Sequence, residues 1–219
     1  MFTGIVEEKG KIKQIKRNKS SLTLMIEAKT VTSDVNIGDS ISVNGVCLTV
    51  TSYSDGWFTV DVIPETYRGT SLANTEIGSE VNLERAMSAG GRFGGHFVSG
   101  HVDVIGKIEN IWTEDNAKYI HISIDQDGLH YIALKGSITV DGTSLTVFGL
   151  KENGFIISLI PETQSATILG QKQQGDIVNV EYDMLAKYME RMLTVQHNSK
   201  QTNERSVTKS KLEQYGFID

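Results

Sequence analysis

Four residues differ in a chemically informative way from the residues that stand 96 or 97 positions later. In each pair the later residue gains an imidazole, a carboxylate, an ammonium or a hydroxyl group: Ile5 becomes His101, Asn44 becomes Asp141, Gly38 becomes Lys135 and Cys47 becomes Ser144. Such groups bind polar ligands and move protons. The pattern predicts two related pockets for similar ligands, of which the second is chemically richer.

Other polar residues agree between the two copies. Thr49 matches Thr146, and the Glu-Thr pair at residues 65–66 matches the pair at 162–163. All of them stand at expected strand ends or turns, where the mouth of a barrel would present them to a ligand. Ordinary strand propensity accounts equally well for the threonines, and a repeated turn is the alternative for the Pro-Glu-Thr segments.

The remaining motifs exclude several kinds of site. Cys47 is the only cysteine, so an intrachain disulfide and a multi-cysteine zinc site are impossible. His96 and His101 lack the partner spacing of a metal site, and neither a Gly-x-Ser-x-Gly elbow nor a Gly-x-Gly-x-x-Gly fingerprint occurs. The glycine-rich residues 88–95 lack the Lys-Ser or Lys-Thr of a phosphate-binding loop and are interpreted as a linker. We predict no metal.

An internal repeat underlies these comparisons. Four separate blocks hold one register, apart from a single-residue indel: 4–12 with 100–108, 40–50 with 137–147, 63–66 with 160–163, and 78–82 with 175–179. A period of this length exceeds any solenoid unit, so each copy is predicted to be a domain.

Each copy has the pattern of short strands joined by tight turns. Residues 40–43 and 46–50 flank Asn44-Gly45, a dipeptide typical of a two-residue hairpin turn, and Asp141-Gly142 takes the same place in the second copy. Residues 57–62 and 155–160 are further predicted strands. About six short strands per copy, without a long helix, predict a small antiparallel barrel, whose closure removes exposed edges.

Composition and charge limit the partners. Of 219 residues, 39% are hydrophobic and 22% are charged, and the formal charge is -6. The dense basic stretch at residues 9–19 is interpreted as a solvated β-hairpin, so no nucleic-acid partner is predicted. No apolar run approaches a membrane span, and acidic residues interrupt the amino terminus before a signal peptide could form. The predicted location is the cytoplasm.

A helical pattern follows the second copy. From Met184, apolar residues recur at Leu185, Tyr188, Met189, Met192 and Val195. This amphipathic helix either packs on the chain's own barrels or meets copies of itself at a symmetry axis, and we favour the second arrangement. Beyond His197 the tail is polar until residues 211–219, which predict a helical turn closed by a glycine.

Several blocks together resemble the riboflavin synthase alpha-chain family, over about residues 1–190. They are Met-Phe-Thr-Gly-Ile-Val at 1–6, Asn-Gly-Val-Cys-Leu-Thr-Val at 44–50, Gly-His-Phe-Val-Ser-Gly-His-Val at 95–102, Asp-Gly-Thr-Ser-Leu-Thr-Val at 141–147, and the two Ile-Pro-Glu-Thr motifs. The blocks have the family's order and spacing, which makes the combination specific.

The resemblance implies an all-β fold of two tandem, homologous, six-stranded antiparallel Greek-key barrels followed by a C-terminal α-helix. Residues 1–95 would form the first lumazine-binding barrel with its linker, 96–184 the second barrel, and 185–219 a trimerisation helix and polar tail. The implied activity is that of a transferase in riboflavin biosynthesis that needs no cofactor. Two molecules of 6,7-dimethyl-8-ribityllumazine exchange a four-carbon unit and give riboflavin and 5-amino-6-ribitylamino-2,4-pyrimidinedione.

The resemblance also implies an assembly. Members of the family are homotrimers, in which the active site lies between the first barrel of one subunit and the second barrel of the next. Two lumazine molecules would occupy each site, and two identical substrates explain why the barrel is duplicated. Some members bind lumazine synthase, and the resemblance leaves that partner open here.

The family's ligand contacts carry over to matching positions. In the first copy they are Gly4, Ile5, Val6, Cys47, Leu48, Thr49, Asp61, Val62, Ile63, Pro64, Glu65 and Thr66. In the second copy they are Gly100, His101, Val102, Lys135, Ser144, Leu145, Thr146, Ser158, Leu159, Ile160, Pro161, Glu162 and Thr163, with Asp183 as a polar contact at the shared interface. By this resemblance His101 and Ser144 would manage protons on the second-barrel substrate, and Cys47 would line the other pocket, either as a nucleophile or as part of its wall.

A second hypothesis is a non-catalytic lumazine- or flavin-binding protein. Lumazine-carrying fluorescent proteins resemble the same family and hold the ligand without converting it. In such proteins the second-copy Ser-Leu-Thr and Ser-Gly-His blocks have degenerated, whereas here both are intact, at residues 144–146 and 99–101. The intact blocks favour the enzyme.

Overall fold

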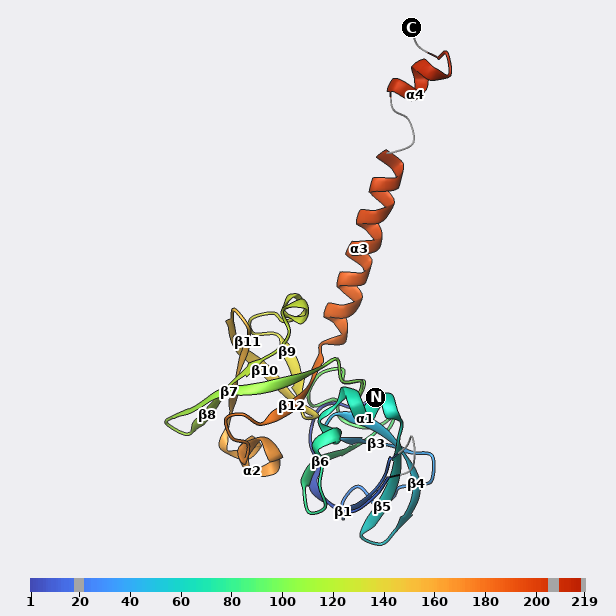
Figure 1. Cartoon of the computed structure of the whole chain (residues 1–219). Helices are drawn as coiled ribbons and strands as arrows, with labels where there is room; N and C mark the ends of the chain where they lie inside the picture. The colour runs from blue at the N-terminus through green and yellow to red at the C-terminus, as the bar shows by residue number, and fades with distance from the viewer. Residues whose placement is uncertain (18–21, 205–208, 218–219) are drawn as a thin grey trace. The chain divides into compact units, whose positions relative to one another are not determined.

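A computed structural model describes residues 1–17, 22–204 and 209–217 of the chain. The chain forms two compact units, Met1–Met184 and Leu185–Asp219. The first unit contains two closed barrels of six antiparallel strands each (Figure 1). The predicted all-β fold with a duplicated barrel is therefore confirmed.

The two barrels have the same strand order. Strands β1 to β6 follow the order β1-β2-β5-β4-β3-β6 around the first wall, and strands β7 to β12 follow the matching order β7-β8-β11-β10-β9-β12 around the second. The first-barrel strands are β1 (Glu8–Arg17), β2 (Leu22–Glu27), β3 (Ser40–Val43), β4 (Val46–Ser54), β5 (Trp57–Val62) and β6 (Glu80–Arg85). Those of the second barrel are β7 (Val104–Glu114), β8 (Ala117–Ser123), β9 (Ser137–Val140), β10 (Thr143–Lys151), β11 (Gly154–Leu159) and β12 (Ile177–Tyr182).

Two hairpin turns connect β3 to β4 and β9 to β10. Asn44 and Gly45 have φ angles of 49° and 80°, and Asp141 and Gly142 have φ angles of 44° and 77°. A two-residue turn of this kind needs positive φ at both positions, which glycine adopts freely and Asn or Asp accept more readily than other residues. Both predicted hairpins are confirmed.

Each barrel encloses its own hydrophobic core. Ile12, Leu24 and Phe58 are fully buried in the first barrel, as are Ile120 and Phe155 in the second. Burial of each such side chain stabilises the fold by about 1.5–3 kcal/mol relative to its exposure. The predicted strand at 57–62 is β5, and β11 lies one residue before the predicted 155–160.

The two Ile-Pro-Glu-Thr motifs begin short helices, α1 (Pro64–Gly69) and α2 (Pro161–Ala166). Proline suits the first helical position because its missing N–H has no intrahelical partner to lose. A threonine hydroxyl after each helix donates to the carbonyl of the motif's threonine, Thr70 to Thr66 and Thr167 to Thr163, at 2.7 Å. Short 3-10 helices occupy Ser71–Asn74, Gln126–Tyr131 and Ile168–Gly170.

Two equivalent asparagines, Asn82 on β6 and Asn179 on β12, join the barrels. Asn82 Nδ2 donates to the carbonyl of Asp141, and Asn179 Nδ2 donates to the carbonyl of Asn44, both at 2.8 Å. Each asparagine oxygen also accepts from a backbone amide of the opposite barrel, at 2.8 and 2.6 Å. Because both side chains are buried and their hydrogen bonds are satisfied, they fix one barrel against the other.

The amino terminus lies against the start of the second copy. Phe2 and Val98 exchange two backbone hydrogen bonds, of 2.8 and 3.2 Å, in an antiparallel bridge. The amide of His96 also donates to the carbonyl of Thr3, at 3.1 Å. The segment that follows the predicted linker is therefore tied to the first few residues of the chain.

The second unit consists of helical segments. Helix α3 (Met184–Glu204) begins at the predicted residue, and its Leu185, Tyr188, Met189, Met192 and Val195 are each 51–72% exposed. Helix α4 (Lys209–Gln214) is followed by Gly216 with φ 74°, which confirms the predicted glycine-closed turn. Within the described ranges, no helix combines the length and the hydropathy that crossing a membrane requires.

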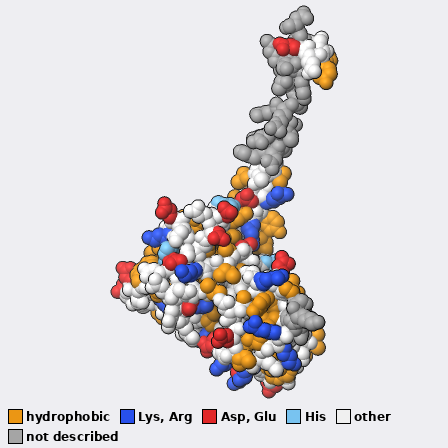
Figure 2. Space-filling view, in the orientation of Figure 1, with side chains coloured by type: hydrophobic (Ala, Val, Ile, Leu, Met, Phe, Trp, Pro, Cys, Tyr) orange, Lys and Arg blue, Asp and Glu red, His pale blue; other side chains and the backbone are white. Residues whose placement is uncertain are grey.

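The charges of the two-barrel unit are mixed. Figure 2 shows acidic and basic side chains interspersed with hydrophobic ones over the visible face of this unit. On that face neither sign of charge is gathered into a single patch.

Candidate functional site

The predicted site residues are grouped across the two barrels. The carbonyl of Gly4, from the first copy, accepts a hydrogen bond of 2.7 Å from the amide of Ser144 in the second barrel. The carbonyl of Gly100, from the second copy, accepts one of 2.8 Å from the amide of Cys47 in the first barrel. Val102 packs against the first barrel's core. The segment at residues 4–6 is thus hydrogen-bonded to Ser144 through Gly4, and the segment at 100–102 is hydrogen-bonded to Cys47 through Gly100.

Both contacts between the copies need glycine at the residue that supplies the carbonyl. Gly4 and Gly100 have φ angles of 76° and 82°, in the left-handed region that glycine adopts at no steric cost. A Cβ atom on Gly4 would lie 2.6 Å from Ser144 Cβ, and one on Gly100 would lie 2.5 Å from Cys47 Cβ. The two glycines therefore permit the close approach that brings backbone atoms of one copy to the site residue of the other.

A histidine that we did not single out completes the Ser144 site. The buried His96 places Nδ1 2.7 Å from Ser144 Oγ, and its Nε2 lies 3.0 Å from Thr139 Oγ1. Ser144 and Thr139 are directly opposite on β10 and β9, so their side chains share one face of the sheet. The imidazole bridges the two hydroxyls.

The surroundings of His96 favour its neutral form. Burial lowers its pKa below the usual 6.5, and the nearby charge of Asp183 acts in the opposite direction. A neutral imidazole has one donor and one acceptor nitrogen, so one hydroxyl donates to the ring and the other accepts from it. With Nδ1 as the acceptor, His96 is a base in contact with Ser144 Oγ.

The sequence held little signal for this contact. A shift of 96 places His96 one position before Met1, so the repeat offers no first-copy residue to compare with it. The spacing of His96 bears only on metal binding, which it disfavours. Its position inside the block at 95–102 was the one indication that it belongs to the site.

His101 is placed with the other site. Its amide donates 3.1 Å to Glu181 Oε2, its side chain is exposed, and it follows the Gly100 that binds Cys47. The imidazole that contacts Ser144 Oγ is that of His96. The joint proton role of His101 and Ser144 on the second-barrel substrate stays a prediction.

Cys47 has different surroundings from Ser144. It is partly exposed and lies opposite Ser42 on β3, as Ser144 lies opposite Thr139. A Cβ atom on Gly100 would lie 2.8 Å from a ring carbon of Phe2 and 2.5 Å from Cys47 Cβ, so the aromatic ring and Cys47 border the same glycine. One site thus has a hydroxyl in contact with an imidazole, and the other has a cysteine that borders the same glycine as an aromatic ring.

Lys135 occupies a backbone position that suits glycine. Its φ is 63°, and its first-copy counterpart Gly38 has φ 95°. A left-handed conformation costs a non-glycine residue about 1–2 kcal/mol. The ammonium group lies 4.5 Å from the ring centroid of Phe148, which is a cation–π contact. The second copy therefore keeps a strained lysine where the first has glycine, which supports a functional role.

The other predicted contacts lie at the ends of β4, β5, β10 and β11, at the starts of α1 and α2, and next to Gly4. Exposed or partly exposed are Ile5, Val6, Thr49, Asp61, Ile63, Pro64, Glu65, Thr66, Thr146, Ser158, Ile160, Pro161, Glu162 and Thr163. Buried are Leu48, Val62, Leu145 and Leu159. The buried side chains fill the barrels, so these four residues can offer a ligand only backbone groups.

Acid–base chemistry and polar recognition are what this arrangement supports. Within residues 1–17, 22–204 and 209–217, no three His, Cys, Asp or Glu side chains come together as a metal site. The polar groups are instead paired with each other and with backbone, as at His96 and Asp61, whose carboxylate accepts 2.7 Å from Thr23 Oγ1.

Comparisons with known proteins agree with the duplicated architecture. Residues 3–86 and 99–183 each match the lumazine binding domain family. The chain is 52% identical over 218 residues to a riboflavin synthase of Bacillus amyloliquefaciens, and 50% identical over 217 residues to one of Bacillus subtilis. Both alignments cover 99% of this chain and 100% of the relative.

Solved structures extend the similarity. A crystal structure of LumP complexed with riboflavin has a TM-score of 0.77 at 27% identity, covering 83% of this chain and 99% of that chain. LumP complexed with 6,7-dimethyl-8-(1'-D-ribityl) lumazine gives a TM-score of 0.75 at the same identity and coverage.

Proposed function

Because the chain belongs to the lumazine-binding riboflavin synthase family and is therefore an enzyme of the transferase class, we propose that the Ser144 site and the Cys47 site each hold one substrate molecule of the riboflavin synthase reaction. Two molecules of 6,7-dimethyl-8-ribityllumazine react, and one transfers a four-carbon unit to the other. The products are riboflavin and 5-amino-6-ribitylamino-2,4-pyrimidinedione. Two copies of one substrate need two pockets of related shape.

The difference between the two sites is the observation that carries the proposal. The imidazole of the buried His96 contacts Ser144 Oγ, whereas Cys47 and the ring of Phe2 border Gly100. A donor and an acceptor of the same compound share a shape but need different proton transfers. Related barrels with unlike polar groups meet both requirements.

The residues of the Ser144 site supply a path for a proton. The methyl group at C7 of the lumazine is acidic because the ring delocalises the resulting carbanion. Ser144 passes a substrate proton to His96 Nδ1 across 2.7 Å. Burial makes protonated His96 unfavourable, so the proton returns readily to a later intermediate.

The Cys47 site would bind the second molecule. Exposed His101 manages protons on the molecule bound there or on the one that faces it, and Cys47 either adds at C7 or lines the pocket. Holding the two rings in the reactive orientation supplies a large share of the rate enhancement. Exposed Thr and Glu side chains at 49, 65–66, 146 and 162–163 suit the ribityl hydroxyls.

We also propose how the chain is divided and assembled. Residues 1–95 and 96–184 are the two lumazine-binding domains, and 185–219 carry the helix that joins three subunits, so that unlike barrels of neighbouring subunits face each other. The exposed apolar residues of α3 support this role. A cytoplasmic location is part of the same proposal.

Removal of residues 185–219 is expected to convert the trimer to monomers. The apolar face of α3 would then be missing, and multi-angle light scattering would report a mass near that of one chain. A milder variant, Met192→Lys, should shift the same equilibrium, while Arg191→Ser should leave it unchanged. A truncated chain that stays trimeric would show that the barrels themselves assemble.

Incubation with 6,7-dimethyl-8-ribityllumazine, without metal or added cofactor, is the direct test of the activity. We expect riboflavin to accumulate at one molecule for every two lumazines consumed, followed by its visible absorbance. LumP structures hold both the lumazine and riboflavin, which makes a carrier the competing candidate. A bound, spectrally shifted lumazine with no flavin formed would establish the carrier instead.

A further inference from the structure

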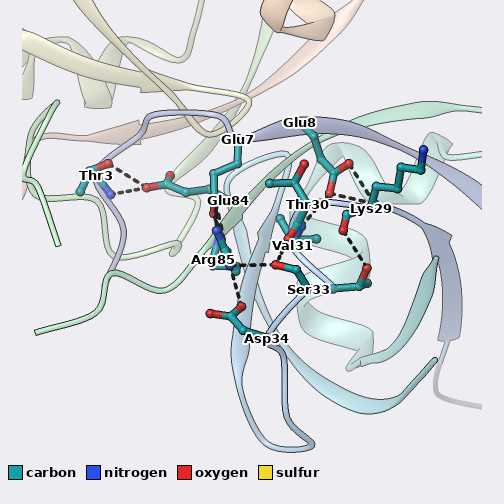
Figure 3. A network of polar contacts seen from close by, with 11 residues as sticks. Thr3, Glu7, Glu8, Lys29, Thr30, Val31, Ser33, Asp34, Glu84 and Arg85 are labelled. Atoms are coloured by element: carbon teal, nitrogen blue, oxygen red, sulfur yellow. Dashed lines mark hydrogen bonds and ion pairs between the residues drawn. The ribbon is translucent and has the colours of Figure 1, made fainter. Parts of the chain in front are cut away.

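Two buried glutamates bind the segments that cross between the barrels. Glu84 on β6 accepts hydrogen bonds from the amides of Thr3 and Gly4, at 2.6 and 3.0 Å, and from Thr3 Oγ1 at 2.9 Å. Figure 3 shows the contact of Glu84 with Thr3. Burial raises the pKa of Glu84, and these hydrogen bonds act in the opposite direction.

Glu181 on β12 makes the equivalent contacts in the second copy. Its Oε1 accepts from the amide and the hydroxyl of Ser99, both at 2.7 Å, and its Oε2 accepts from the amides of Gly100 and His101, at 2.9 and 3.1 Å. The side chain is 2% exposed. A carboxylate with four donors holds this segment firmly, because charge-assisted hydrogen bonds are stronger than neutral ones.

The contacts continue into the opposite barrel. Gly100, held through its amide by Glu181, binds the amide of Cys47 through its carbonyl. Gly4, held through its amide by Glu84, binds the amide of Ser144 in the same way. Each glutamate is therefore linked through one glycine to the backbone amide of Cys47 or Ser144 in the opposite barrel.

The other acidic residues near Glu84 do not bind the segment at Thr3 and Gly4 but have different partners (Figure 3). Glu7 and Asp34 bind Arg85, and Glu8 accepts from backbone amides in the loop after β2. Glu8 is thus a carboxylate that holds backbone amides of its own barrel, which makes it a suitable control.

We propose that Glu84 and Glu181 are positioning residues for the site in the opposite barrel. Glu181 of the second barrel fixes the backbone that covers Cys47, and Glu84 of the first barrel fixes the backbone that covers Ser144. The consequence for turnover rests on the proposed function. The positioning itself does not, because it follows from contacts within one chain.

The single cysteine allows a direct test. In Glu181→Gln an amide replaces one carboxylate oxygen and faces N–H donors, so the segment at 99–101 loosens and uncovers Cys47. We expect the full-length protein to react with iodoacetamide about tenfold faster, as the loss of one or more hydrogen bonds to a charged group predicts. Glu84→Gln and Glu8→Gln should leave the rate within about twofold of the wild type, since neither binds this segment.

Two outcomes would overturn the proposal. They are an unchanged rate in Glu181→Gln, and an equal increase in all three variants, which would indicate general loosening of the fold. If Glu181→Gln does not fold, Ser99→Ala removes one of the four donors and should still speed labelling about threefold, against no change in Thr3→Val. In turnover assays Glu181→Gln and Glu84→Gln should lower kcat more than they raise KM. An inactive wild type would refute the proposed function, and the labelling result would still decide the positioning.

Discussion

Replacement of His96 by glutamine is expected to lower kcat by about 100-fold or more, which is the usual contribution of a general base. A glutamine amide can still contact Thr139, but it can neither reach Ser144 as the imidazole does nor take up a proton. The measurement is steady-state formation of riboflavin, with lumazine binding followed separately by fluorescence. We expect binding to change much less than turnover.

An asparagine at the same position distinguishes two roles of His96. Its amide can restore a hydrogen bond to Ser144 Oγ in place of Nδ1 without being basic. His96→Asn should therefore remain as slow as His96→Gln. Recovery to within a few-fold of the wild type would mean that His96 only orients the hydroxyl. Ser144→Ala combined with His96→Gln should be no slower than either alone, because residues that act as a unit are not additive.

The lowered pKa of His96 also predicts that the folded state loses stability as the pH falls below 6.5. Below the usual pKa of 6.5 the unfolded chain takes up a proton on this residue, while the folded chain takes it up only at lower pH. The contribution of neutral His96 to stability is therefore complete above 6.5 and is lost as the pH falls from there to its folded pKa. Denaturant titrations of wild type and His96→Gln should show the wild type losing more stability across this window.

Gly142→Ala is expected to destabilise the two-barrel unit by about 2–5 kcal/mol. Gly142 has φ 77°, and a Cβ atom there would lie 2.7 Å from the amide nitrogen of Gly45 in the opposite barrel. The substitution thus combines a left-handed alanine with a clash between two backbones at the junction. Gly45→Ala should act alike, since its Cβ atom would lie 2.8 Å from the amide nitrogen of Gly142.

Gly56→Ala is the matched control for the backbone strain. Gly56 has φ 82°, but a Cβ atom there would meet nothing within 4 Å. We expect it to cost only the strain of about 1–2 kcal/mol. Thermal or urea unfolding of the three variants measures the difference. Equal losses at Gly142 and Gly56 would mean that the two turns can move apart without cost to stability.

Much of this fold could be predicted from the sequence because its determinants are local. Alternating residues in the strands, the Asn-Gly and Asp-Gly turns and the helical spacing after Met184 each depend on neighbours a few positions apart. Because the two halves of the sequence are repeats, a barrel predicted for one half is predicted for the other as well. The Ile-Pro-Glu-Thr motifs were located by the same means, although they begin helices that their turn-like composition did not indicate.

The sequence by itself thus determined two barrels, their turns, the terminal helix and the residue types available for chemistry. Only the tertiary structure decided which of those residues meet. The pairing of Ser144 with His96, of Cys47 with Gly100, and of Asn82 and Asn179 with the opposite turns joins residues 48 to 135 positions apart. Such contacts leave no periodic signal in the chain, because they depend on how two closed surfaces pack and not on the conformation of either segment.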